Sequence, residues 1–138
     1  MFKKVTTAVL AMLFSLLIVP VAEGHERQIG FHELVHTADA IFIGRVADIE
    51  SFETDALVGT RVSFNAISPI VSRSTANPFM GDVIAIEYAG GTIGGRTSDV
   101  CCAPVFSIGE EVLVMSQLDG DRYFNPFAGG RQGLFRIM

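Results

Sequence analysis

Lysine, histidine and cysteine are all scarce in this chain of 138 residues. Its only lysines are Lys3 and Lys4, and the eight arginines are scattered without forming a basic stripe. Once residues 1–24 are removed, eight basic residues stand against 14 acidic ones, which gives a net charge of −6. An acidic surface repels phosphate backbones, so we expect no nucleic acid among the partners of this protein.

Long apolar runs are also missing, except for one near the N-terminus. Two lysines precede the run Ala8–Val19, and Ala22 and Gly24 supply small residues at the −3 and −1 positions of a cleavage site. The run has 12 residues, fewer than the ~20 that span a bilayer, which disfavours an uncleaved anchor. We therefore expect a signal peptide at 1–24 and a single secreted or periplasmic domain at 25–138, with no transmembrane segment in the mature chain.

The two cysteines, Cys101 and Cys102, are adjacent, and no third cysteine in the chain offers either of them another partner. In an exported protein they can form a strained vicinal disulfide, pair between chains or stay reduced. We expect them to be linked to each other, as a local staple of the loop before Ala103-Pro104.

The segment that follows the signal peptide reads as one short helix and then a series of strands. Phe31, Leu34 and Val35 fall at i, i+3 and i+4, which predicts a helix of two or three turns within Gly30–Ala40. Beyond it, short β-like segments are separated by glycine-rich turns, as in a small closed barrel or a sandwich. Gly44 predicts a bulge in the first of these strands. The expected strands are 40–49, 60–67, 82–88, 94–97, 111–118, 122–124 and 133–138.

Alternation within these strands predicts which side chains fill the core. In the strand 60–67, apolar residues alternate with polar ones, so one face is expected to be buried and the other exposed. The expected core residues are Val62, Phe64, Ala66, Val83, Ala85, Val112, Val114 and Phe135.

The segment Leu34–Val46 resembles the opening of netrin-like domains, the class that includes the tissue inhibitors of metalloproteinases. In that class an Ala-Asp pair, here Ala38-Asp39, precedes a long coiled strand, and a strand like Thr60–Ile67 follows. Ala103–Val114 and Gly129–Ile137 resemble small exported bacterial domains of unassigned function. The resemblance implies an all-β fold, an OB-like closed or partly open β-barrel of five to seven short strands with one short N-terminal helix.

The chain departs from those inhibitors at its N-terminus. They chelate the zinc of the target enzyme through an N-terminal cysteine, whereas the mature chain would begin with His25 and has no cysteine nearby. The resemblance therefore supports the fold more than it supports inhibitory activity, because function inferred from fold is an analogy.

The pentapeptide 32–36, His-Glu-Leu-Val-His, matches the H-E-x-x-H pattern of zinc hydrolases, with Glu33 in the position of the general base. We interpret the match as a coincidence, because the helix is short and no later histidine exists to complete a zinc site. A third ligand would have to be a carboxylate such as Glu50 or Glu53, in a strand or hairpin. We therefore expect no catalytic residues and no enzymatic activity.

Metal binding without catalysis is a separate alternative. The three histidines, His25, His32 and His36, all lie in the first twelve residues of the expected mature chain. The amine and imidazole of His25 could chelate copper, and His32 or His36 would complete a nitrogen-rich site. The competing interpretation is a polar, exposed helix face that binds nothing.

The leading hypothesis is an exported, non-enzymatic binding module whose partner is another exported protein, such as a secreted or envelope protease that it engages in an inhibitor-like way. The first alternative is a small zinc-dependent hydrolase that uses His32, Glu33 and His36. The second is a periplasmic metal-binding protein. We expect no cofactor under the leading hypothesis, and zinc or copper under the alternatives.

Overall fold

The computed structural model describes residues 27–74, 79, 81–118 and 126–138. The predicted signal peptide at 1–24, the predicted metal ligand His25 and the predicted strand at 122–124 lie outside the described residues. Among the helices of the described part, none is long and apolar enough to cross a membrane.

The helix predicted near the N-terminus is present as α2 (Phe31–Thr37), seven residues long. It is held against the sheet by Leu34, which is only 3% exposed, and Val35 packs partly buried beside it. The guanidinium of Arg73 donates hydrogen bonds of 2.8 Å to the carbonyls of Val35 and Ala38. These bonds satisfy carbonyl groups at the C-terminal end of the helix, where no intrahelical partner is available.

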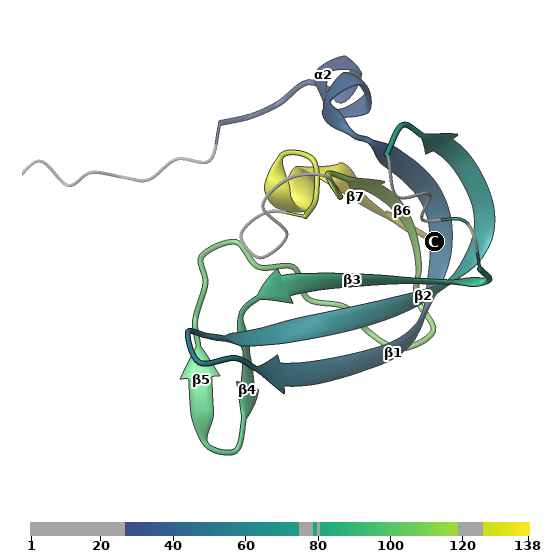
Figure 1. Ribbon diagram of the computed structural model, residues 1–138. Helices are drawn as coiled ribbons and strands as arrows, with labels where there is room; N and C mark the ends of the chain where they lie inside the picture. Colours follow the sequence, from purple (N-terminus) through teal and green to yellow (C-terminus); the bar gives the residue numbers. More distant parts are fainter. Residues whose placement is uncertain (1–26, 75–78, 80, 119–125) are drawn as a thin grey trace, which may run out of the picture.

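The rest of the described chain is β-structure, which confirms the all-β prediction (Figure 1). Five strands form an antiparallel sheet in the order β3-β2-β1-β6-β7, and a small hairpin pairs β4 with β5. The strands are β1 (Ala40–Glu53), β2 (Val58–Ser72), β3 (Val83–Ala89), β4 (Gly91–Ile93), β5 (Arg96–Ser98), β6 (Glu111–Ser116) and β7 (Leu134–Ile137).

β1 and β2 are longer than predicted, at 14 and 15 residues, and they curve strongly along their length (Figure 1). The cause is a set of register shifts in their pairing, one of which falls between Ile43 and Gly44 and confirms the predicted bulge. Such shifts bend a strand and increase its twist. A Cβ atom at position 44 would lie 2.9 Å from the Cβ of Phe64, so glycine allows β2 to approach at this bend.

The main core lies on the inner face of this curved sheet and is rich in aromatic rings. Phe64 meets Phe42 and Phe106 edge-on, with ring centroids 5.6 and 5.5 Å apart. Tyr88 and Phe127 continue the cluster, with ring centroids 5.9 Å apart. The structure confirms four predicted core residues as buried, and it shows Ala66 as partly buried against them. The four are Val62, Phe64, Val112 and Val114.

The prediction of burial is wrong for three residues. Val83 is 54% exposed, Ala85 is also exposed, and Phe135 is 38% exposed beside Phe31 of α2. In β3, Ile84 pairs with the buried Phe64, and directly opposed residues share a face of the sheet. Ile84, Ile86 and Tyr88 therefore face the core, and Val83 and Ala85 face outward. Both alternations of this strand begin with apolar residues, so the pattern left the choice of face open.

The predicted strand at 94–97 is wrong in its first half and right in its second, since Arg96 and Thr97 belong to β5. Gly94 and Gly95 form the turn between β4 and β5, with φ angles of 55° and 80°. These positive φ angles are readily adopted by glycine, which explains why the pair marks a hairpin turn and not a strand.

Candidate functional site

The two histidines of the H-E-x-x-H match lie side by side on the exposed face of α2. The Nε2 atom of His32 is 3.2 Å from the Nε2 atom of His36, and the ring centroids are 4.4 Å apart. Glu33 points elsewhere and accepts a hydrogen bond of 3.4 Å from Arg27. The structure therefore brings the two predicted nitrogen ligands together and directs the predicted base to an ion pair.

The carboxylates considered as a third ligand are not near this pair. Glu50 and Glu53 belong to the far end of β1, whereas α2 precedes its beginning (Figure 1). Glu50 lies 3.6 Å from Arg61, and Glu53 forms an ion pair with Arg96. Within the described ranges, no three His, Cys, Asp or Glu side chains converge as a metal-binding group.

The cysteine pair lies in the loop between β5 and β6. Their Sγ atoms are 3.0 Å apart, Cys101 is exposed, and Cys102 has a φ angle of 66°. A positive φ at a residue other than glycine is uncommon and shows that the loop turns sharply here. The vicinal link between the two stays a prediction.

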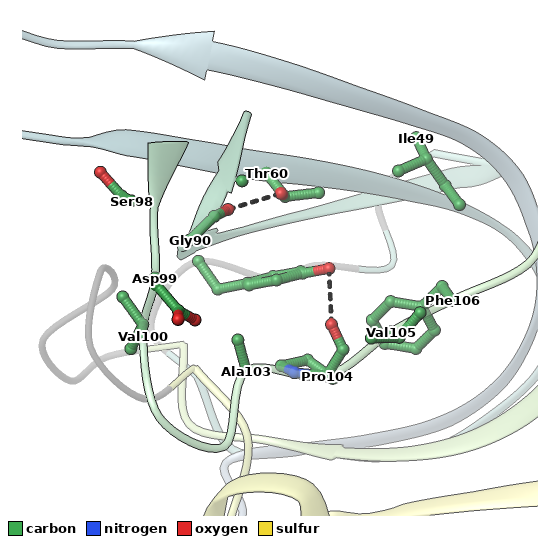
Figure 2. Close-up of a pocket in the computed structure, with 12 residues that line it drawn as sticks. Ile49, Thr60, Gly90, Ser98, Asp99, Val100, Ala103, Pro104, Val105 and Phe106 are labelled. Atoms are coloured by element: carbon green, nitrogen blue, oxygen red, sulfur yellow. Dashed lines mark hydrogen bonds between the residues drawn. The ribbon is translucent and has the colours of Figure 1, made fainter. Parts of the chain in front are cut away.

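A hollow that the sequence analysis did not anticipate lies beside Tyr88, with a volume of about 360 Å³. β1, β2 and β3 supply its floor, and β4, β5 and the loop after β5 supply its wall. Figure 2 shows Asp99 and Val100 at one end of the hollow and Val105 and Phe106 at the other. We call this feature the Tyr88 hollow. Its lining is Ile49, Thr60, Tyr88, Gly90, Gly91, Ser98, Asp99, Val100, Ala103, Pro104, Val105 and Phe106.

Internal hydrogen bonds hold the polar groups of the Tyr88 hollow in place. The Tyr88 hydroxyl donates to the carbonyl of Pro104 at 3.2 Å, and the Thr60 hydroxyl donates to the carbonyl of Gly90 at 2.7 Å (Figure 2). The Ser98 hydroxyl accepts from the backbone N–H of Val58 at 2.9 Å. Because these groups are already satisfied, the hollow is a preformed feature of the fold.

Burial dominates the electrostatics of Tyr88. It raises the pKa of Tyr88 to about 12, while a hydrogen bond with the side chain of Thr60 acts in the opposite direction. Burial disfavours the charged phenolate, so the phenol is neutral and serves as a hydrogen-bond donor at physiological pH.

Asp99 is the one ionisable carboxylate in the lining of the Tyr88 hollow. No residue in the described part of the chain donates a hydrogen bond to the side chain of Asp99. The apolar residues Val100 and Val105 lie in the same lining. The sequence pattern does not predict this arrangement, because its residues come from separated segments. The glycine pair Gly90-Gly91 and the rigid Pro104 are the only sequence signals near the hollow, and both are equally typical of ordinary turns.

The resemblance of Leu34–Val46 to netrin-like domains stays a prediction, and the chemistry of the histidine pair and of the Tyr88 hollow is the basis for assigning a function. No model of a known protein family matches this chain, and no curated protein matches it either.

Proposed function

We propose that this chain is an exported, non-enzymatic module that binds a segment of another exported protein in the Tyr88 hollow. The observation that carries the proposal is the lining of the hollow, which is apolar apart from a few positioned polar groups. A preformed concave site with this composition is typical of binding sites in proteins.

The charge of the site defines the partner more closely. Asp99 has no described hydrogen-bond donor of its own, and the expected mature chain carries a net charge of −6. A lysine or arginine side chain of the partner would lay its aliphatic stem along Val100 and Pro104 and direct its cation to Asp99. Opposite charges of this kind speed association and select the partner.

The composition of the Tyr88 hollow supports binding over catalysis. Its described lining contains no histidine, cysteine or lysine. The hydroxyl groups of Thr60 and Ser98, which could act as nucleophiles, are engaged with backbone groups. A nucleophile needs a base within hydrogen-bond reach, and neither described hydroxyl forms a hydrogen bond with Asp99, the one carboxylate of the lining.

The finer features of the fold belong to the same proposal. The strong curvature of β1 and β2 supports an OB-like barrel, closed or partly open, as the resemblance implies. An exported protease is the partner that an inhibitor-like module would engage. In this proposal a segment of that protease binds in the Tyr88 hollow. N-terminal sequencing of the secreted or periplasmic protein tests the export step, with His25 expected as the first residue.

Binding can be tested with short peptides and a matched pair of variants. The probes are acetylated, amidated tripeptides, Leu-Arg-Leu and Leu-Glu-Leu, added at millimolar concentration to the isotope-labelled mature protein. We expect amide shifts at Tyr88 and across 99–106 with the arginine peptide, and none with the glutamate peptide. Val105→Lys should abolish these shifts, because the new cation lies in the lining of the hollow and repels the arginine of the peptide.

Ile108→Lys is the control. Ile108 is 63% exposed and Val105 is 76% exposed, both in the loop before β6, but only Val105 lines the hollow. Both variants should fold, since neither side chain is buried. The proposal is wrong if neither peptide binds, or if the two variants weaken binding equally.

A further inference from the structure

The histidine pair on α2 has the spacing that a shared metal ion requires. Zinc lies about 2.0–2.1 Å from a histidine nitrogen. With the Nε2 atoms of His32 and His36 3.2 Å apart, an ion at that distance from both subtends an N–metal–N angle of about 100°. This angle falls between the right angle of an octahedral site and the tetrahedral angle. The two nitrogens therefore need no rearrangement to chelate one ion.

The helix that carries the pair is anchored on both sides. Leu34 is buried in the core, and Arg73 caps the C-terminal carbonyls. Before the helix, the side-chain amide of Gln132 accepts from the N–H of Ile29 and donates to the carbonyl of Arg27, each at 2.8 Å. Because the helix is already ordered, metal binding does not carry the entropic cost of ordering the backbone. This favours chelation by the two histidines of this short helix.

We propose that His32 and His36 form a two-nitrogen site for a divalent transition-metal ion. Imidazole suits copper, nickel and zinc, and the general order of affinity places Cu²⁺ above Ni²⁺ and Zn²⁺. The 3.2 Å contact between the Nε2 atoms fits a tautomer in which one ring carries its proton on Nε2 and donates it to the other ring. Metal binding moves that proton to Nδ1 of the same ring, so that both Nε2 lone pairs face the ion.

Water or a partner's side chain completes the coordination sphere. The site lies on α2, away from the Tyr88 hollow, so it adds to the proposed peptide binding and does not depend on it. It also differs from a zincin, because Glu33 is engaged with Arg27.

The test is a titration of the mature protein with Ni²⁺ and with Zn²⁺, followed by calorimetry and by the imidazole signals in NMR spectra. Every protein in the series carries His25→Ala, so that the expected N-terminal amine and imidazole do not chelate together. We expect one equivalent to bind, with both histidine rings perturbed. His32→Ala or His36→Ala should each weaken binding at least tenfold, since only one ligand remains.

The decisive control keeps two histidines but changes their spacing. The double variant His36→Ala, Thr37→His places the rings five positions apart, about 140° around a helix, where they cannot share an ion. It should bind as weakly as His36→Ala alone. Binding equal to that of the parent, or a parent that binds no metal, would overturn the proposal. Val105→Lys should leave metal binding unchanged, which separates this site from the Tyr88 hollow.

Discussion

The two sites lie at opposite ends of the curved sheet and are built in different ways. The histidine pair sits on α2 before β1 begins, and the Tyr88 hollow lies near the β4–β5 hairpin (Figure 1). The pair consists of two side chains one helical turn apart, exposed and close to each other because of local geometry. The hollow needs the five strands β1 to β5 and the loop after β5 to be in place. Damage to the core should therefore affect the two sites unequally.

The largest expected effect comes from removing a ring beneath the hollow. Phe106 is buried, packs edge-on against Phe64, and also lines the hollow. We predict that Phe106→Ala lowers the free energy of unfolding by about 3–5 kcal/mol, because it leaves a cavity in the core. Urea denaturation measures this change. In conditions where the variant is still folded, peptide binding should be lost and metal binding retained.

Phe135→Ala is the matched control at the other end of the molecule. Phe135 is exposed, and its ring centroid lies 5.8 Å from that of Phe31 on α2. We expect a loss of less than about 1 kcal/mol, as for most substitutions near the surface. Equal losses in the two variants would show that the aromatic cluster is not the main source of stability.

The same contrast explains which features were predictable from the sequence. The helix α2 follows from the spacing of Leu34 and Val35, and the bulge at Gly44 follows from a glycine inside a strand. These signals act over a few residues. The inward face of β3 depends on how Ile84 pairs with Phe64 across the sheet, so the alternation of apolar residues could not decide it.

The candidate sites divide in the same way. The adjacency of His32 and His36 could be predicted from their four-residue spacing, although the 3.2 Å separation of the nitrogens could not. The Tyr88 hollow joins Ile49, Thr60 and the loop 98–106, which are far apart in the sequence. Asp99 is exposed, and nothing near it in the sequence indicates that it also borders an apolar surface.

A second prediction concerns the pH dependence of stability that arises from Tyr88 in the floor of the hollow. Burial raises the pKa of Tyr88 to about 12 in the folded protein, against an ordinary value of 10.0. The folded chain therefore holds this proton more tightly than the unfolded chain. The contribution of Tyr88 to the free energy of unfolding is fully present below pH 10, and it is lost as the pH rises from 10 through 12.

Urea denaturation at a series of pH values checks this, with Tyr88→Phe as the comparison. The variant should lack the part of the alkaline loss that arises from Tyr88, and it should lack the late phase of phenolate absorbance. If the parent and the variant lose stability in parallel, Tyr88 is not held neutral by burial. Zn²⁺ binding at the histidine pair should not depend on this substitution, since the two lie on separate elements.

The smallest expected effect concerns Cys101 and Cys102, which lie between two lining residues of the hollow, Val100 and Ala103. We predict that they are linked to each other in the exported protein, because disulfides persist in oxidising compartments. Intact-mass analysis should show a monomer lighter by two hydrogen atoms than the reduced form. A link between neighbours closes a very short loop, so the chain-entropy term contributes only on the order of 1 kcal/mol.

Reduction should therefore change the free energy of unfolding little, yet it should alter peptide binding, because the link constrains the loop that forms one wall of the hollow. Cys101→Ser should behave like the reduced protein, and neither change should affect metal binding on α2. A disulfide-linked dimer that becomes a monomer on reduction would contradict the vicinal link. Unaltered peptide binding after reduction would show instead that the strands, and not this loop, shape the binding surface.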